Sequence, residues 1–458
     1  MKTKLAIFLL SALCLWACEK DKITTDSSAM LEFSSDSIFF DTVFTSVGST
    51  TRRIKVYNRG KYGVKISQIK LAGGAASNYQ ININGVAGNF VPDIELAGKD
   101  SLNIFVKVTI NPNSDQLPFI VNDSIEFTTN GNYQKVVLTA YGQNAVFLKD
   151  LVIDANTVWN NSLPYVIYNS VKVNTNQTLT IQKGSRIYFH KNAQLKIAGT
   201  LKVNGTLNDS ISFSSDRLEK IYQDEPGQWG GLHFLSTSRD NHINYAYIKN
   251  AVTGVRVDSL SLNSGPKLLL TNSIIKNMEL AGLYLDNTEL AGFNNLIANC
   301  GRHLIYAANG GRYNLKQNTF VNAGSRFPRT TPSLFFSDFS GSGVSKSMDL
   351  TLINNIIWGN LADELLIQKS GTLPFSQIVR KNLIKSRDTA LEGLGNILNL
   401  NPMFKAAEKD NFSLSPLSPA GNKGEDLTAD TYFGLWLSKD LNGKARLFPS
   451  DLGSYEIL

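Results

Sequence analysis

The stretch TNSIIKNMELAGLYLDNTELAGFNNLIANC, residues 271–300, contains one short pattern twice. Asn272-Ser-Ile-Ile-Lys-Asn277 returns 22 residues later as Asn294-Asn-Leu-Ile-Ala-Asn299. In both copies two apolar residues and one further residue precede a closing asparagine. The element recurs elsewhere, so the closing residues form a series: Asn250, Asn277, Asn299, Asn322 and, with one residue inserted, Asn360. A repeat of about 22 residues, lengthened in places by insertions, indicates a solenoid whose additional residues form loops.

Apolar–polar–apolar triplets distinguish between the kinds of solenoid. Five of them begin between residues 179 and 213, at Leu179, Ile187, Leu195, Leu201 and Ile211, about eight residues apart. Three such strand-and-turn steps approximate the asparagine period, which predicts three short strands per coil and parallel sheets with coils about 4.8 Å apart. A leucine-rich repeat has a similar period, but it has one strand per repeat, which the triplets exclude.

The closing asparagines have a physical reason in such a stack. Asn side chains at the same corner of successive coils can hydrogen-bond to one another and satisfy groups that a buried turn leaves unpaired. Asn also tolerates the left-handed backbone of tight corners. We therefore expect a structural ladder, not a ligand site, from Asn250, Asn277, Asn299, Asn322 and Asn360.

Three segments carry a resemblance in this region: residues 195–206 (LKIAGTLKVNGT), 211–213 (ISF) and 228–234 (QWGGLHF). They resemble the opening coils of right-handed parallel β-helix proteins, the fold of pectate lyases and of many bacterial surface proteins. The resemblance covers residues 150–400. It implies the fold and no single activity, because this fold carries lyases, hydrolases, adhesins and inert stalks.

Residues 30–146 consist of short alternating segments such as Arg53–Tyr57 and Leu102–Val108, with a hairpin signal at Asn130-Gly131-Asn132. Seven or eight strands in about 115 residues predict an antiparallel β-sandwich. Residues 40–43 (FDTV) and 136–142 (VVLTAYG) resemble immunoglobulin-like domains of cilium-associated and bacterial envelope proteins. The expected fold class is therefore all-β, an N-terminal antiparallel β-sandwich followed by a right-handed parallel β-helix. The resemblance implies a spacer or an adhesive module for the sandwich, and we favour the spacer.

The N-terminus has the features of an export signal. Lys2 and Lys4 precede the short apolar run 5–16, and the run ends in Leu15-Trp16-Ala17-Cys18. This ending resembles the lipobox of bacterial lipoproteins. It implies a signal peptide at residues 1–17, a lipid on Cys18, a tether at residues 18–29 and an envelope location, most simply at the outer membrane. An ordinary secretory signal is the alternative.

Composition limits the remaining partners. Cys300 alone would stay as a thiol after lipidation and is expected in the core. The net charge of +7 comes from scattered basic residues with no run of five, so we expect no nucleic-acid partner. The four histidines have no metal-binding spacing, so neither a metal nor another cofactor is expected.

The last segment, residues 401–458, resembles the closing segment of secreted β-helix proteins. The resemblance rests on three stretches that follow in the same order: NPMF (401–404), FSLSPLSPAG (412–421) and DLGSYE (451–456). An open coil end exposes unpaired strand edges, which predicts a cap there. Four charged residues are expected to form an ion-pair cluster in preference to a metal site: Asp440, Arg446, Asp451 and Glu456.

The sequence contains no complete catalytic signature of the polysaccharide-cleaving β-helix enzymes. Gly254-Val-Arg-Val-Asp258 and Gly282-Leu-Tyr-Leu-Asp286 align on their glycines, however. The alignment predicts Arg256 beside Tyr284 and Asp258 beside Asp286 on the outer face of neighbouring coils. Such a group suits sugar hydroxyls or Ca²⁺, although a solvated face with incidental charges would look the same. Insertions at residues 219–228 and 326–346 would wall a groove.

Three functions remain open at this point. The preferred one is a lipid-anchored, non-catalytic protein that binds or scaffolds an extended polysaccharide or another envelope component. The second is a polysaccharide lyase or glycoside hydrolase that uses Asp258, Asp286 and Arg256 as the base. The third is an inert stalk.

Overall fold

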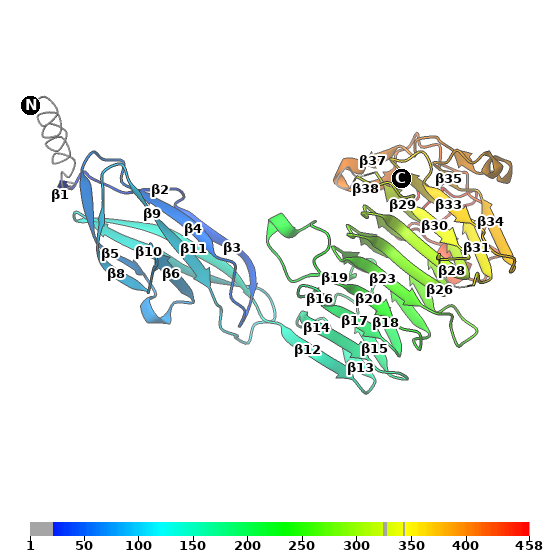
Figure 1. Ribbon diagram of the computed structural model, residues 1–458, viewed down its shortest axis with the longest axis horizontal. Coiled ribbons are helices and arrows are strands. Elements are labelled where there is room, and N and C mark those ends of the chain that lie inside the picture. The colour runs from blue at the N-terminus through cyan, green and yellow to red at the C-terminus, as the bar shows by residue number, and fades with distance from the viewer. Residues whose placement is uncertain (1–21, 324–327, 342–343, 458) are drawn as a thin grey trace, which may run out of the picture. The chain divides into compact units, whose positions relative to one another are not determined.

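The computed structural model describes residues 22–323, 328–341 and 344–457 (Figure 1). The chain forms two compact units, Met1–Asn144 and Ala145–Leu458. No helix in the described ranges is long and apolar enough to cross a membrane. The predicted signal peptide and Cys18 lie outside these ranges.

The first unit is a β-sandwich with one mixed and one antiparallel sheet. The mixed sheet contains β1 (Ile23–Thr24), β5 (Gly63–Leu71), β8 (Phe90–Leu96), β10 (Phe119–Thr129), β11 (Asn132–Gln143) and β3 (Ser37–Phe44). The antiparallel sheet contains β2 (Glu32–Phe33), β4 (Arg52–Tyr57), β9 (Ser101–Val108), β6 (Tyr79–Ile83) and β7 (Val86–Ala87). Alternate residues such as Val56, Ile104 and Phe127 are fully buried between the sheets, which follows from the period of two.

The second unit is a three-sided parallel β-helix, in which β12 (Val146–Ile153) and β14 (Tyr165–Val173) bend around the first corners. The first face contains β16 (Arg186–Phe189), β19 (Ile211–Ser215), β22 (Ala246–Lys249), β25 (Ile274–Lys276), β27 (Leu296–Ala298), β29 (Thr319–Asn322), β32 (Ile356–Gly359), β35 (Leu383–Ile384) and β36 (Ile397–Leu398). The second face contains β17 (Gln194–Ile197), β20 (Gly231–Phe234), β23 (Thr253–Asp258), the first halves of β26 (Ala281–Phe293) and β28 (His303–Lys316), β30 (Leu334–Ser337) and β33 (Leu365–Gln368).

The third face completes each coil. It contains β13 (Thr157–Trp159), β15 (Thr178–Gln182), β18 (Thr200–Asn204), β21 (Asn241–Asn244), β24 (Leu268–Thr271), the second halves of β26 and β28, β31 (Met348–Ile353) and β34 (Phe375–Arg380). Inward residues stack in register from coil to coil, for example Leu195, Leu232, Val255 and Leu283, and form one continuous apolar core. The predicted fold class, a β-sandwich followed by a parallel β-helix, is confirmed.

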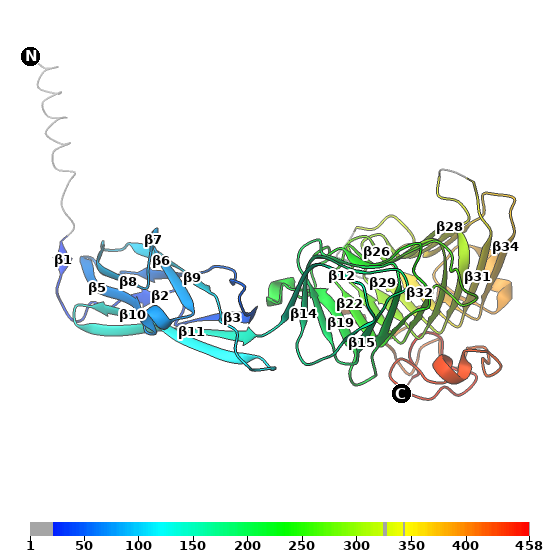
Figure 2. The same ribbon diagram turned by 90° about the horizontal axis from the view of Figure 1, so that it is seen from below.

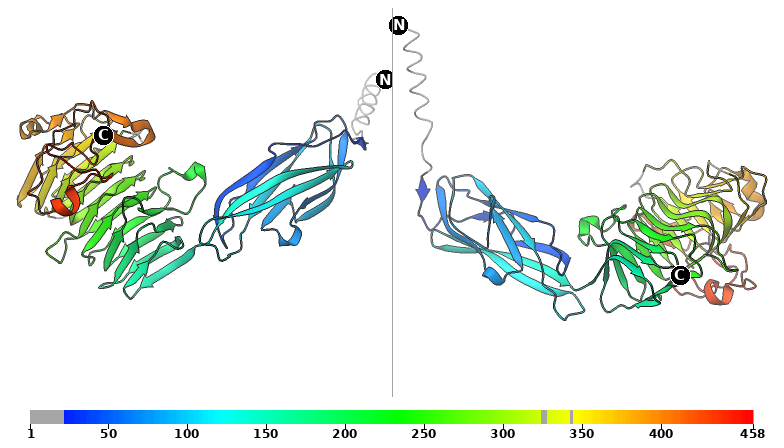
Figure 3. Two further views of the ribbon diagram at one scale, coloured as in Figure 1. Left: turned by 180° about the vertical axis from the view of Figure 1, so that it is seen from behind. Right: turned by 60° about the horizontal axis from the view of Figure 1, so that its bottom comes forward.

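The C-terminal segment, residues 401–457, differs from the predicted end cap. Most of it runs beside the coils, as Figure 2 and Figure 3 show. It includes β37 (Phe404–Ala406), β38 (Asn411–Leu414) and a helical turn at Phe433–Leu437. Its apolar side chains pack on outward residues of the first and third faces, including Leu296, Ile356, Leu383, Phe293 and Ile353. These faces are apolar on the outside and need a cover, which is the physical reason for the difference.

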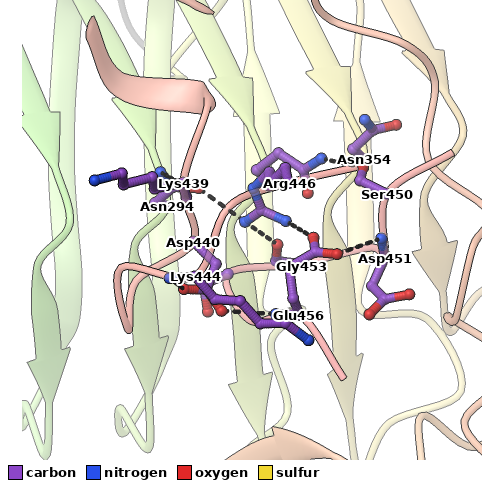
Figure 4. A network of polar contacts seen from close by, with 12 residues as sticks. Asn294, Asn354, Lys439, Asp440, Lys444, Arg446, Ser450, Asp451, Gly453 and Glu456 are labelled. Atoms are coloured by element: carbon purple, nitrogen blue, oxygen red, sulfur yellow. Dashed lines mark hydrogen bonds and ion pairs between the residues drawn. The ribbon is translucent and has the colours of Figure 1, made fainter. Parts of the chain in front are cut away.

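A buried polar network holds this segment in place (Figure 4). The Arg446 guanidinium pairs with Glu456 and donates to Asn294 Oδ1 at 2.9 Å and to the Gly453 carbonyl at 3.0 Å. Asp440 accepts the backbone N–H of Glu456 at 2.8 Å. The Asp451 carboxylate accepts backbone N–H groups of the same segment. The four predicted residues therefore gather in one network, with Arg446–Glu456 as its ion pair.

Candidate functional site

The five closing asparagines do not bond to one another. In the parts of the chain that the structure describes, no hydrogen bond joins any two of their amides. Asn250, Asn277 and Asn299 have the left-handed backbone predicted for a corner, with φ of 65°, 59° and 54°. Their Nδ2 groups donate to two separate loops. Asn250 donates to the Gln223 carbonyl and Asn277 to the Asp224 carboxylate of one loop, whereas Asn299 donates to the Asp410 carboxylate of the other.

The last two closing asparagines also differ from the prediction. Asn322 exchanges hydrogen bonds with the backbone of Cys300 in the preceding coil, at 3.0 and 3.2 Å. Asn360 is exposed and donates to the Ala323 carbonyl. The physical reason is that other acceptors lie at this corner: covering loops or backbone carbonyls accept the amide N–H groups in place of a neighbouring asparagine.

The amide ladder exists at another corner, between the third and first faces. Its members, one per coil, are Asn295, Asn318, Asn355, Asn382 and Asn396. Each Nδ2 donates to Oδ1 of the next member at 3.0 to 3.1 Å. Each Oδ1 also accepts the backbone N–H of the preceding member. The first four side chains are 0–1% exposed, so the ladder satisfies a buried corner.

The second face is the side of the coils that the C-terminal segment leaves open. In the described chain, the apolar clusters that contain this segment include residues of the first and third faces and none of the second. Arg256 on the second face has 46% of its side chain exposed. We therefore treat this face as the candidate functional surface.

Basic residues occupy one outward column of the second face. Lys172 pairs in register with Lys196, Lys196 with His233, and His233 with Arg256. No ion pair joins either lysine to a carboxylate of the described residues. Like charges that face each other across neighbouring strands are unfavourable, so a column of this kind favours an anionic or hydrogen-bonding ligand.

Aromatic residues continue the same column. Arg256 lies next to Tyr284, with its guanidinium 5.1 Å from the ring centroid. Tyr284 stacks on Tyr306, and Tyr306 on Phe335, each with centroids 5.2 Å apart. His303 lies 5.3 Å from Tyr306. Because the rings stack along the coil axis, the column presents ring edges and phenol hydroxyls to solvent at the spacing of the coils.

The predicted pair of carboxylates is present but already has partners. Asp258 lies next to Asp286 in register, as the glycine alignment predicts. Asp258 accepts from His233 Nε2 at 2.7 Å and from Arg256 Nε at 2.9 Å. Asp286 accepts from the Asn309 amide at 2.7 Å. Burial acts to raise the pKa of Asp258, but the hydrogen bonds from His233 and Arg256 outweigh it and leave the pKa below 3.8.

These partners limit the chemistry of the pair. An ionised carboxylate that already accepts hydrogen bonds from an imidazole and a guanidinium is a weak base and a poor cation ligand. No group of three or more metal-binding side chains is found in the described ranges. The arrangement suits hydrogen bonds to hydroxyl groups better than it suits Ca²⁺.

A buried lysine positions the end of this strand. Lys267 is fully buried, and its Nζ donates to the Asp258 carbonyl at 2.6 Å and to the Ser236 carbonyl at 2.7 Å. Burial lowers the pKa of Lys267 to about 8. The ammonium thus fixes the backbone that carries Asp258 without reaching the outer surface.

Five residues of the column were not predicted from the sequence: Lys172, Lys196, His233, Tyr306 and Phe335. The signal was available, because Gly231-Leu-His-Phe234 aligns with the two glycine-led strands and places His233 below Arg256. Tyr306 and Phe335 occupy the middle of apolar triplets in the following coils. Extending the alignment in both directions would have identified the whole column.

Comparisons with known proteins add little. No protein-family model matches the chain, and the search of curated proteins finds no match. A family 123 glycoside hydrolase from Clostridium perfringens is similar at 11% identity and TM-score 0.19, over 26% of this chain and 30% of that one. The chain thus spans under a third of that enzyme.

Two further solved structures have the same TM-score, 0.19. The ASH/PapD-like domain 7 of human CEP192 is 12% identical over 28% of this chain and 94% of that one. A protein of unknown function from Porphyromonas gingivalis W83 is 10% identical over 28% and 60%. Similarity at this level carries no conclusion about function.

Proposed function

We propose that this protein is a lipid-anchored envelope protein that binds an extended polysaccharide along the second face of its β-helix, without cleaving it. The observation that carries the proposal is the single outward column of basic and then aromatic residues, one per coil: Lys172, Lys196, His233, Arg256, Tyr284, Tyr306 and Phe335. A linear polymer can contact equally spaced groups on a rigid surface, whereas a small molecule would contact few of them.

The remaining parts of the proposal concern the anchor and the spacer. The ending Leu15-Trp16-Ala17-Cys18 supports lipidation of Cys18, and the residues that follow would serve as the tether. The immunoglobulin-like sandwich would then hold the β-helix away from an outer membrane. Cys18→Ala should move the protein from the detergent-extracted membrane fraction to the soluble fraction and abolish labelling by a palmitate analogue. Unchanged labelling would refute the anchor.

Binding can be tested with matched variants. Isothermal titration of the mature protein with pectin, alginate and glycosaminoglycans should show binding that Arg256→Gln and Tyr306→Ala weaken. Arg186→Gln on the first face and Tyr133→Ala in the sandwich are matched controls that should bind normally. Equal loss in the controls, or no binding to any extended polysaccharide, would contradict the proposal.

Cleavage is the alternative, and one contact favours it. His233 and Asp258 lie 2.7 Å apart beside Arg256, an arrangement that could orient an imidazole toward a substrate. A lyase would release unsaturated products that absorb in the ultraviolet, and a hydrolase would release reducing ends. Turnover that His233→Ala or Asp286→Ala abolishes would replace the binding proposal with an enzymatic one.

A further inference from the structure

A groove of about 920 Å³ lies on the first face, away from the column proposed to bind polysaccharide. Its floor is formed by Tyr247 and Lys249 of β22 and by Lys276 of β25, and it continues past Asn277 and Asn299. Three of the closing asparagines that were predicted to be purely structural line it: Asn277, Asn299 and Asn322.

One wall of the groove is an insertion. Residues 216–230 connect β19 to β20 and number 15, whereas the same corner takes 3 residues at 250–252 and 4 at 277–280. The extra residues fold back over the next coils, where Lys249 Nζ and Asn250 Nδ2 donate to the Gln223 carbonyl at 2.8 and 2.9 Å. Ordering a long loop is entropically costly, so long ordered loops are usually functional.

The other wall comes from the far end of the chain. The turn between β37 and β38 brings Asp410 to Lys276 at 2.7 Å and to the Asn299 amide at 2.7 Å. The backbone of Asp410 is left-handed, with φ of 57°. Two segments almost 190 residues apart in sequence thus flank the same two strands, and polar side chains of the coils anchor both.

The charges that line the groove cancel. The lining contains three lysines, Lys249, Lys276 and Lys409, and three carboxylates, Asp224, Glu408 and Asp410. This balance differs from the basic column of the second face and disfavours an ionic ligand. Ammonium groups donate and carboxylates accept hydrogen bonds, and a sugar hydroxyl does both. Tyr247, with Lys249 and Lys276 each 5.9 Å from its ring centroid, adds an aromatic surface at the floor.

We infer that this groove is a second saccharide site, which takes a short neutral oligosaccharide. The two walls and the volume of about 920 Å³ suit a ligand of a few sugar rings, and the balanced donors and acceptors select hydroxyl groups over carboxylates or sulfates. The site is independent of the second face, so it stands whether or not the column binds an extended polymer.

The experiment titrates the full mature protein with short neutral xylo-, manno-, cello- and malto-oligosaccharides. One of these series should bind, and Lys249→Gln and Ala407→Trp should each weaken it by about tenfold or more, the second by filling the groove. Tyr284→Ala on the second face is the matched control and should leave this binding unchanged. Circular dichroism verifies that each variant is folded.

The outcomes separate this inference from the proposed function. Loss of oligosaccharide binding in Tyr284→Ala, with none in the groove variants, would assign the ligand to the second face and overturn the inference. Failure of all neutral oligosaccharides to bind would also overturn it, even where extended polymers bind. Free oligosaccharides and the same glycans fixed to an array distinguish a soluble ligand from a surface glycan.

Discussion

At the scale of single residues, the position of an asparagine decides whether it stabilises the coils. Asn318 is fully buried, donates to the Gly292 carbonyl and to Asn355, and accepts from Asn295. Asn318→Ala leaves several of these groups unpaired and should lower the free energy of unfolding by about 2–4 kcal/mol.

Urea denaturation measures this loss for the β-helix. Asn360→Ala is the matched control, because Asn360 is exposed and should change stability by about 0.5 kcal/mol or less. Equal effects of the two substitutions would mean that the buried ladder does not carry the stability that its hydrogen bonds suggest.

His242 should make stability depend on pH. Burial, aided by the positive charge of Lys202, lowers the pKa of His242 from 6.5 to about 4. Between these values the unfolded chain binds a proton that the folded chain excludes. The stability is therefore fully present above pH 6.5 and is lost as pH falls toward about 4, by at most about 1.4 kcal/mol per pH unit.

Urea midpoints recorded across this pH range test the sign and the source of the effect. His242→Gln should give a shallower fall than the unmodified protein. It should not remove the slope, because burial also lowers the pKa of His303. An unchanged slope in the variant would show that other groups cause the dependence.

At the scale of strands, in-register stacking explains which contacts the sequence predicts. Parallel coils turn an alignment of the chain with itself into a list of neighbours, so Arg256 beside Tyr284 and Asp258 beside Asp286 follow from two glycines. The same pattern offers an asparagine at both ends of the repeat. Alignment cannot tell which end forms the ladder. The hydrogen bonds between amides show that it is the end with Asn295 and Asn318.

The course of the C-terminal segment could not be derived in this way. Its contacts join residues more than 100 positions apart, such as Asn294 with Arg446, and no repeat relates them. Outward apolar residues, including Leu296, Ile356 and Leu383, were the available sign that the first face needs a cover. The groove depends on the same segment. The sequence predicted walls at residues 219–228 and 326–346, whereas the structure pairs the first of these with the turn at Asp410.

Arg446 should be the residue on which docking of this segment depends. Arg446→Met leaves the buried Glu456 carboxylate without its cation, which should cost about 3–5 kcal/mol. The fluorescence of Trp436, whose ring lies 4.8 Å from that of His242, should report detachment at lower urea concentration. Lys444→Met, at an exposed residue of the same turn, is the control.

The Arg446–Glu456 pair can be separated from the packing around it. Removing both charges in Arg446→Met with Glu456→Leu should recover part of the loss, since an apolar pair avoids the buried unpaired carboxylate. No recovery in the double variant would assign the loss to Asn294 and the Gly453 carbonyl instead.

At the scale of the whole molecule, the β-helix sets the length of ligand that the second face can bind. The column from Lys172 to Phe335 spans six coil steps, about 29 Å at about 4.8 Å per step. Affinity for a series of acidic oligosaccharides should rise with length until the ligand covers this span and then level off.

Binding of acidic ligands should weaken as the salt concentration increases, because salt screens the basic residues at one end of the column. Binding of neutral ligands in the groove should respond little. Titration calorimetry of the length series at two salt concentrations measures both trends. Affinity that saturates at two or three sugar rings would contradict an extended site and place acidic ligands in a local pocket.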